Sequence, residues 1–372
     1  IKDQKNGSTL INKTDKTSID TAVALVMEMA KGSQPDDAYD IAEKQPSQSF
    51  SKGDKSASLD TMYRSLEEFV DYVKSTYPKI KLEAAIMDFN HSTSLFQNTN
   101  EVDFEIREGM YDFSTMFLSK DGKNTSSFNY TGVSALKIDK PLYKYGTIDS
   151  LLKQSVEQLQ TQNIPEKFVG QILVTPDCLG DFLGFITGDI SDGKMITGNS
   201  IYKNKLNKQI THPKLTFHSH PVSNEIADGY FVTSDGYIAE NSTIVKNGIL
   251  KTHLLGIYGA NKLEKNRAVN DGGATIVEAG DNPHSDIIKN IEKGLLLARF
   301  FGGNPSSNGD ISGVAKNSYY IENGEIKHPL TETMVSGNIR EMFENLDEIS
   351  SDCIDFGSGI LPWISFKGIT VS

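Results

Sequence analysis

The sequence has little cysteine, no long apolar run and a shortage of positive charge. Its 372 residues include only two cysteines, Cys178 and Cys353, too few for a disulfide framework and typical of a reducing cytoplasm. The longest apolar run, at residues 295–298, is far shorter than the ~20 residues that a membrane-spanning helix needs. A formal net charge of −12 repels phosphate backbones. We therefore expect neither nucleic acid nor a membrane among the partners.

Several common catalytic motifs are also missing. The chain has no G-x-S-x-G stretch, no histidine followed by glutamate, and no two histidines four or five residues apart. Residues 188–194 follow most of the phosphate-binding P-loop pattern, but Met195 stands where a serine or threonine would bind magnesium. We therefore assign no catalytic residue and no cofactor-binding residue to this chain.

The pattern of apolar residues predicts an α+β fold, with helices and antiparallel sheets. Helical spacing at residues 19–32, 58–76 and 148–159 is interrupted by alternating, strand-like stretches at residues 82–89 and 101–107. From Ile201 onward the chain is rich in strands, with Asn-Gly hairpin turns at Asn247 and Asn323. Repeated strand–helix–strand units, which would indicate an α/β fold, are absent.

The length of the chain favours two or three domains over a single core. Residues 1–50 read as a first part that ends in a polar linker, and residues 51–164 as a middle α+β domain. Pro165 marks the start of a strand-rich domain over residues 165–372.

Four local predictions are specific enough to test. Thr17 and Asp20 predict a capping box at the first helix. A helix is predicted from Ser285 as far as Leu295, from its apolar residues at helical spacing. The charged run over residues 344–352 is predicted to be the solvated face of a helix. Both cysteines are predicted to be small, buried apolar residues.

Residues 300–343 carry the most distinctive pattern. A loop rich in glycine and asparagine leads to tyrosines, an Asn-Gly turn, a return strand and a short helix that Ser336 or Asn338 can cap. Further characteristic stretches occupy residues 12–15, 247–263, 270–274 and 367–369. Together they resemble the TldD/PmbA family, which is also named for a suggested modulation of DNA gyrase, and are closer to its PmbA (TldE) members. The resemblance implies an N-terminal α/β part, followed by a strand-rich C-terminal domain. It also implies that the first domain begins before Ile1.

The resemblance implies a cytoplasmic zinc peptidase complex that hydrolyses unfolded peptides. Its catalytic TldD subunit carries HExxxH, in which two histidines hold zinc and a glutamate activates water. The corresponding positions here are Gly184, Phe185 and Asp189, and none of them matches. The resemblance therefore implies a noncatalytic subunit, inactive alone, whose TldD-like partner supplies the zinc. A heterodimer with that partner or a homodimer is expected.

Two other interpretations remain open. His218 and His220 would share one face of a strand and, with Asp228 or Glu225, offer metal ligands to a self-sufficient metallohydrolase. Their HSHP sequence opens the zinc motif of JAMM-type peptidases, but Phe231 replaces the final aspartate of that motif.

The third interpretation is a peptide-binding scaffold. Gly302, Gly303, Asn304 and Asn308 are candidates to line a path for an extended peptide, or they form a structural turn after a helix.

Overall fold

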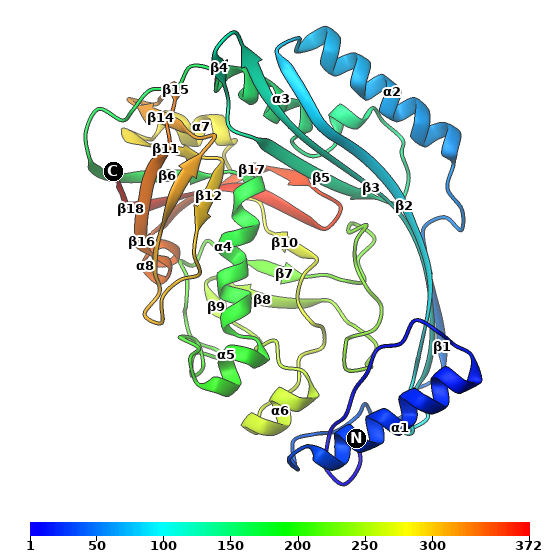
Figure 1. Ribbon diagram of the computed structural model, residues 1–372. Coiled ribbons are helices and arrows are strands. Elements are labelled where there is room, and N and C mark those ends of the chain that lie inside the picture. The colour runs from blue at the N-terminus through cyan, green and yellow to red at the C-terminus, as the bar shows by residue number, and fades with distance from the viewer.

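The computed structural model describes all 372 residues and arranges them around two sheets (Figure 1). The first sheet has the strand order β1-β3-β2, with β4 and β5 also paired to β3. Its elements, with the helices and the 3-10 turn (η1) around them, are α1 Lys16–Gly32, β1 Gln48–Lys52, α2 Leu59–Thr76, β2 Ile80–Gln97, β3 Asp103–Asp121, β4 Asn124–Thr125, β5 Asn129–Ala135, η1 Leu142–Lys144 and α3 Ile148–Glu157.

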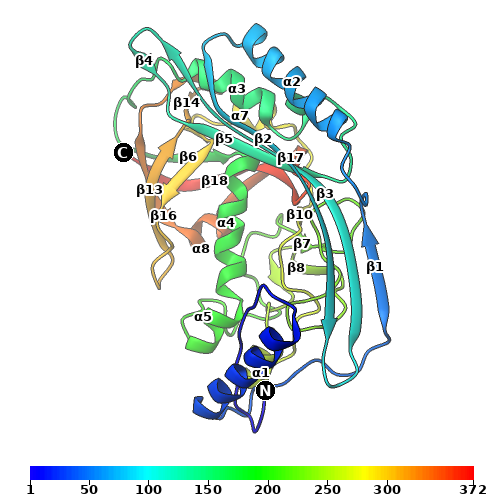
Figure 2. The same cartoon turned by 45° about the vertical axis from the view of Figure 1, so that its right-hand side comes forward.

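The first sheet is dominated by a long hairpin of β2 and β3, which curves away from the rest of the sheet towards α1 (Figure 2). The alternating stretch predicted at residues 101–107 belongs to the long strand β3, which continues to Asp121. Near the far end of the hairpin, β1 pairs in parallel with β3, and Phe50 lies opposite Ile106. Because β1 spans residues 48–52, it crosses the boundary predicted at residue 50, and the division into three domains stays a prediction.

Helices α2 and α3 cover one face of this sheet. Phe69 and Val73 of α2 and Ile148 and Leu152 of α3 are buried in one cluster with residues of β2 and β3. Phe69 meets Phe113 edge to face, with ring centroids 5.0 Å apart. The helical spacing of apolar residues in the sequence therefore identifies both helices and the face that each one buries.

The second sheet contains thirteen strands, which come from residues 168–371. Its strands are β6 Phe168–Val174, β7 Phe217–Ser219, β8 Ser242–Lys246, β9 Ile249–Leu250, β10 Thr275–Val277, β11 Lys293–Leu297, β12 Arg299–Gly302, β13 Asp310–Lys316, β14 Tyr319–Glu322, β15 Glu325–Pro329, β16 Thr333–Asn338, β17 Leu346–Asp355 and β18 Gly359–Val371. Its helices are α4 Pro176–Asp189, α5 Asp192–Thr197, α6 Ile257–Leu263, α7 His284–Lys289 and α8 Ile339–Glu344.

The two faces of the second sheet are covered by different helices. Ile172 and Val174 of β6 face the large core that contains α4, whereas Leu173 faces a smaller cluster with Ile287 of α7. This alternation follows from the two-residue period of a strand. The predicted α+β class is confirmed, but the sheets are not purely antiparallel, because β1–β3, β6–β11 and β10–β18 pair in parallel.

The predicted turns and one of the predicted caps are confirmed. Asn247 and Gly248, and likewise Asn323 and Gly324, have positive φ angles between 49° and 78°, as a type I′ turn requires. Asn338 is the N-cap of α8, and its side chain accepts hydrogen bonds from the backbone N–H groups of the first turn.

Three local predictions are wrong. Asp15, not Thr17, caps α1, and its carboxylate accepts the Ser18 N–H at 3.0 Å. The helix predicted to reach Leu295 ends at Lys289, because Leu295 belongs to the buried strand β11. The charged run over residues 344–352 lies mainly in β17, whose long pairing with β18 overrides its charged composition.

Of the two cysteines, Cys178 is buried on α4, as predicted, whereas Cys353 on β17 is partly exposed. None of the helices combines the length and the apolar character needed to span a membrane.

Candidate functional site

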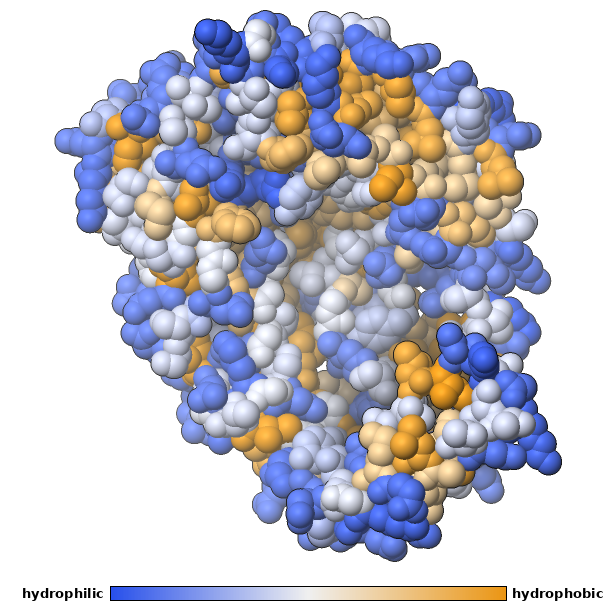
Figure 3. Space-filling model, in the orientation of Figure 1, coloured by the Kyte–Doolittle hydropathy of each residue, from blue (hydrophilic) through white to orange (hydrophobic).

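Helix α4 crosses the centre of the molecule (Figure 1), and its residues line both cavities described below. It begins at Pro176, where a proline fits because the first N–H groups of a helix need no intrahelical partner. Its buried side carries Leu179, Phe182 and Ile186, which pack on the second sheet. The opposite side is open, since a Cβ atom added at Gly184 or Gly188 would meet no atom within 4 Å. The face of the molecule is hollowed in this region (Figure 3).

The positions that correspond to the family's zinc motif do not fit zinc. Gly184 has no side chain, and Phe185 packs edge to face against Phe182 at 6.0 Å. Asp189 is turned into the protein, where Lys194 Nζ donates to its Oδ1 at 2.6 Å and the Ile201 N–H donates to its Oδ2 at 2.6 Å. The only carboxylate of the three is therefore committed to structural contacts.

The loop at residues 302–309 connects β12 and β13, which are antiparallel, so the predicted exit from a helix is wrong. The loop is tied to the start of α8, because Asn338 Nδ2 donates to the Asn308 carbonyl and to Asp310 Oδ1, both at 3.0 Å. Hydrogen bonds from Asn338 and Asn308 lower the pKa of Asp310. Asn308 therefore has a structural task in this loop that the sequence alone did not reveal.

A cleft of about 270 Å³ separates this loop from the C-terminal half of α4. Phe185, Asp189 and Tyr202 form one wall, and the other wall comes from Pro305, Ser306, Ser307 and Gly309. The predicted path residues Gly302, Gly303, Asn304 and Asn308 lie in the same loop, but the lining is provided by their neighbours. The Tyr202 hydroxyl is buried without a hydrogen-bond partner, and burial raises the pKa of this tyrosine above its usual range.

The structure brings His218 and His220 together, as their spacing on a strand predicts. Their ring centroids are 4.7 Å apart. His218 contacts Thr243 Oγ1 through Nδ1 at 3.0 Å and Glu278 Oε1 through Nε2 at 3.2 Å. Burial and the neighbouring His218 lower the pKa of His220, which favours its neutral form.

The carboxylates proposed from the sequence do not complete a metal cluster with these histidines. Asp228 lies against the segment before β18, where its N–H donates to the Gly357 carbonyl at 2.9 Å. Burial and the nearby Asp112 raise its pKa, although Lys52 opposes the shift. Nowhere in the chain do three or more histidine, cysteine, aspartate or glutamate side chains gather as they would around a metal ion.

Another motif stretch, at residues 270–274, holds neighbouring segments together. The buried Asn270 donates through Nδ2 to the Glu240 carbonyl at 2.7 Å and to Ser242 Oγ at 2.8 Å. The Asp271 carboxylate accepts the Ser234 N–H at 2.6 Å. This stretch therefore positions the loops around β7 and β8.

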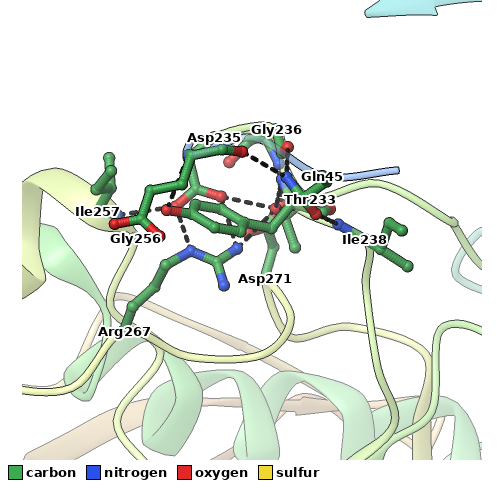
Figure 4. Close-up of polar contacts among 12 residues, drawn as sticks. Gln45, Thr233, Asp235, Gly236, Ile238, Gly256, Ile257, Arg267 and Asp271 are labelled. Carbon is green, nitrogen blue, oxygen red and sulfur yellow. Dashed lines mark hydrogen bonds and ion pairs between the residues drawn. The ribbon is translucent and has the colours of Figure 1, made fainter. Parts of the chain in front are cut away.

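A polar clamp centred on Arg267 lies beside this stretch (Figure 4). Arg267 donates to both oxygens of Asp235 at 2.7 and 2.8 Å, donates to Thr233, and stacks over the Tyr237 ring at 3.8 Å. Burial opposes ionisation of Asp235, but the bonds from Arg267 and Thr233 outweigh it and lower the pKa of Asp235. Gln45 bonds to the Gly236 carbonyl and to the Ile238 N–H, so the clamp fastens the N-terminal region to this loop.

The largest cavity described here, about 720 Å³, was not predicted from the sequence. It lies between β5, the first half of α4 and β12. Asp177 and Asp181 of α4 face it, and burial raises the pKa of both carboxyls. Hydrogen bonds from the Thr147 and Thr131 hydroxyls oppose the shift at Asp177, and the Arg299 guanidinium opposes it at Asp181. Four aromatic residues also line the cavity, at positions 128, 130, 300 and 301. Their spacing in the sequence follows no helical or strand period, so the sequence did not predict that they would lie together.

Comparison with known proteins agrees with the resemblance. The family described as "PmbA/TldA metallopeptidase C-terminal domain" matches residues 169–372. The chain is 24% identical over 297 residues to the metalloprotease PmbA homolog of Buchnera aphidicola subsp. Acyrthosiphon pisum, covering 78% of this chain and 66% of that protein. It is 28% identical over 230 residues to the metalloprotease PmbA of Escherichia coli O157:H7, covering 59% and 49% of the two chains.

The fold also matches a solved structure. The crystal structure of TldE from Thermococcus kodakarensis superposes with a TM-score of 0.84 at 16% identity, covering all of this chain and 88% of that one. At that identity the match concerns the fold alone. The chain spans about half to two-thirds of the length of the two curated relatives.

Proposed function

The chain belongs to the PmbA/TldD metallopeptidase family, and from that premise we propose that it is a noncatalytic, PmbA/TldE-type subunit of a two-chain zinc peptidase. The proposal rests mainly on the residues that occupy the positions aligned with the zinc motif. Gly184 and Phe185 offer no ligand or base, and Asp189 is bound to Lys194 and to the Ile201 N–H. In this proposal a TldD-like partner supplies the zinc and the base, and this chain supplies walls and a peptide path in the cytoplasm.

The substrates in this proposal are unfolded peptides, because the named relatives are metalloproteases and the open face of α4 offers room for an extended chain. Pairing with a second copy of this chain is the alternative to a heterodimer, since closed two-fold assemblies are the commonest.

The test combines metal content, assembly and turnover. The chain expressed alone, without a histidine tag, is expected to carry far less than one equivalent of zinc and to leave an unstructured peptide intact. Co-expression with a TldD-like protein should give one co-eluting species that contains zinc and cleaves the peptide. Separate elution of the two proteins would refute the pairing.

A self-sufficient metallohydrolase is the competing function, because His218 and His220 are adjacent. It requires about one equivalent of metal in the chain alone, lost in His218→Ala. Since His218 already contacts Thr243 and Glu278, we expect that variant to leave the metal content unchanged.

A further inference from the structure

The cleft between the C-terminal half of α4 and the loop at residues 302–309 contains a buried hydroxyl without a partner. Tyr202 lines this cleft and is only 3% exposed, and its hydroxyl makes no hydrogen bond within the chain. A buried polar group without a partner destabilises the folded state, and phenylalanine would fill the same space without that cost. The hydroxyl therefore indicates a ligand that forms a hydrogen bond with it.

The other uncommitted polar groups of the cleft are mostly hydrogen-bond donors. Lys194 Nζ uses one N–H group on Asp189 Oδ1, at 2.6 Å, and its other N–H groups are free. On the opposite wall, Ser307 offers a hydroxyl and a backbone N–H that bond to no other residue. Both Asp189 oxygens already accept, the second from the Ile201 N–H, so the free acceptor is the side-chain oxygen of Asn199. This excess of donors suits a ligand group rich in acceptors.

The charges around the cleft favour an anion on its open side. The Arg340 guanidinium opposes the rise in the pKa of Tyr202, whereas Asp189 and Glu344 add to it, so both signs of charge lie near the hydroxyl. The Asp189 side chain, however, is 5% exposed and paired with Lys194, whose side chain is 43% exposed. The ammonium group and not the carboxylate therefore faces an entering ligand.

The size and the apolar wall of the cleft limit the rest of the ligand. Its volume of about 270 Å³ lies just below the roughly 300–1,000 Å³ that is usual for ligand pockets. Phe185, Pro305 and Ile339 contribute apolar surface to the lining. The Phe185 ring is fixed by its edge-to-face packing on Phe182. A small ligand with one anionic end and a flat apolar part fits these limits.

We propose that this cleft binds a small organic anion, whose carboxylate or phosphate group accepts hydrogen bonds from Tyr202, Lys194 and Ser307. The apolar part of the ligand lies between Phe185 and Pro305. The bound anion joins the end of α4 to the loop that faces it. This inference goes beyond the proposed function, because it requires neither zinc nor a partner chain.

The first test uses two anions, benzoate and phenyl phosphate, titrated into the chain alone by isothermal titration calorimetry. Benzyl alcohol, which has a similar ring and no charge, is the comparison ligand. At least one anion should bind about ten-fold more tightly than the alcohol, and the tighter of the two identifies the oxyanion. Absence of binding by both anions, or equal binding of benzyl alcohol, would overturn the proposal.

The second test removes only the unpaired hydroxyl. Tyr202→Phe should bind the anion about ten-fold more weakly, as for the loss of a hydrogen bond to a charged group. Its Tm should be equal to that of the unmodified chain or higher, because no hydrogen bond within the chain is lost. The matched control is Tyr258→Phe, whose hydroxyl donates to Asp36 at 2.9 Å outside the cleft, and which should bind normally. Unchanged binding by Tyr202→Phe, or a lower Tm, would contradict the role given to this hydroxyl.

The third test locates the ligand. Saturating anion should slow hydrogen–deuterium exchange at residues 303–309 in the unmodified chain, because the ligand joins this loop to α4. Lys194→Ala should remove both the binding and the slowing, since it removes the free ammonium group. If the anion binds without slowing exchange in this loop, the ligand lies elsewhere and the site is wrong.

Discussion

Asp189, which the resemblance aligns with a histidine of the family's zinc motif, allows a direct test of whether its side chain stabilises the fold. In Asp189→Ala, the Ile201 N–H loses the carboxylate that accepts it at 2.6 Å, and Lys194 loses its ion-pair partner. The Asp189 side chain is only 5% exposed, so water cannot easily replace these contacts. The change should loosen the connection between the end of α4, helix α5 and the turn at residues 200–202.

The size of the effect follows from the two contacts. A hydrogen bond to a charged group contributes about 1.5–3 kcal/mol. The Lys194 side chain is 43% exposed, so the ion pair itself adds only about 0–1 kcal/mol. A loss of about 3 kcal/mol corresponds to a fall in Tm of roughly 6–12 °C for a domain of this size.

Thermal unfolding can be followed through Trp363, the single tryptophan of the chain. It lies on β18, which also packs against α4, and its ring stacks on His284 at 4.3 Å. Asp189→Asn, which keeps an oxygen acceptor for the Ile201 N–H, should lose about a third as much stability as Asp189→Ala. Lys194→Ala should lose less than about 1 kcal/mol.

Two results would refute this reasoning. A Tm for Asp189→Ala within error of the unmodified chain would show that the Ile201 contact is not stabilising. A full equivalent of zinc in Asp189→His would show that the position still belongs to a metal site, contrary to its orientation into the protein.

Three further predictions concern contacts away from α4. Arg267→Ala leaves Asp235 buried without its cation and should cost about 3–5 kcal/mol by thermal unfolding, whereas Arg64→Ala on exposed α2 should cost almost nothing; equal losses would contradict the clamp. Bonds from Lys262, the Ala38 N–H and Tyr258 lower the pKa of Asp36 to about 2, so its contribution is present above pH ~4 and lost as the pH falls towards 2. Pepsin cleavage near residues 33–45 should therefore rise over that interval, and Asp36→Asn should remove the dependence; an unchanged profile in that variant would disprove the link. Asn338→Ala should cost about 1 kcal/mol and speed amide exchange in the loop at residues 302–309, and unchanged exchange would show that the cap does not hold the loop.

The sequence predicted elements well wherever one face of the element meets water. The amphipathic spacing of α2 and α3 and the Asn-Gly turns at 247 and 323 depend on local chemistry, and the structure agrees with them. The prediction failed at β11, where Gly294, Leu295, Leu296 and Leu297 are all buried. A strand buried on both faces shows no alternation, so Ile287, Ile291 and Leu295 were indistinguishable from a helical stripe.

The charged stretch at residues 344–352 failed for a related reason. Its charges predicted a solvated helix, but β17 pairs antiparallel with β18, the next strand of the chain, and this pairing is not encoded in the local propensity of residues 344–352. The same limit applies to Asp228, which looked close to His218 in the sequence and instead lies beside Gly357.

The sequence by itself determined the family, the α+β class and the mismatch at Gly184, Phe185 and Asp189, because motifs, periodicity and residue identity are local properties. Only the tertiary structure decided that Asp189 turns inward and that Asn129 and Asp177 face one cavity. That cavity exists because the edge of one sheet stops short of a helix packed on the other. The position of that strand edge relative to the helix depends on how the two sheets pack, and the spacing of residues along the chain does not reveal it.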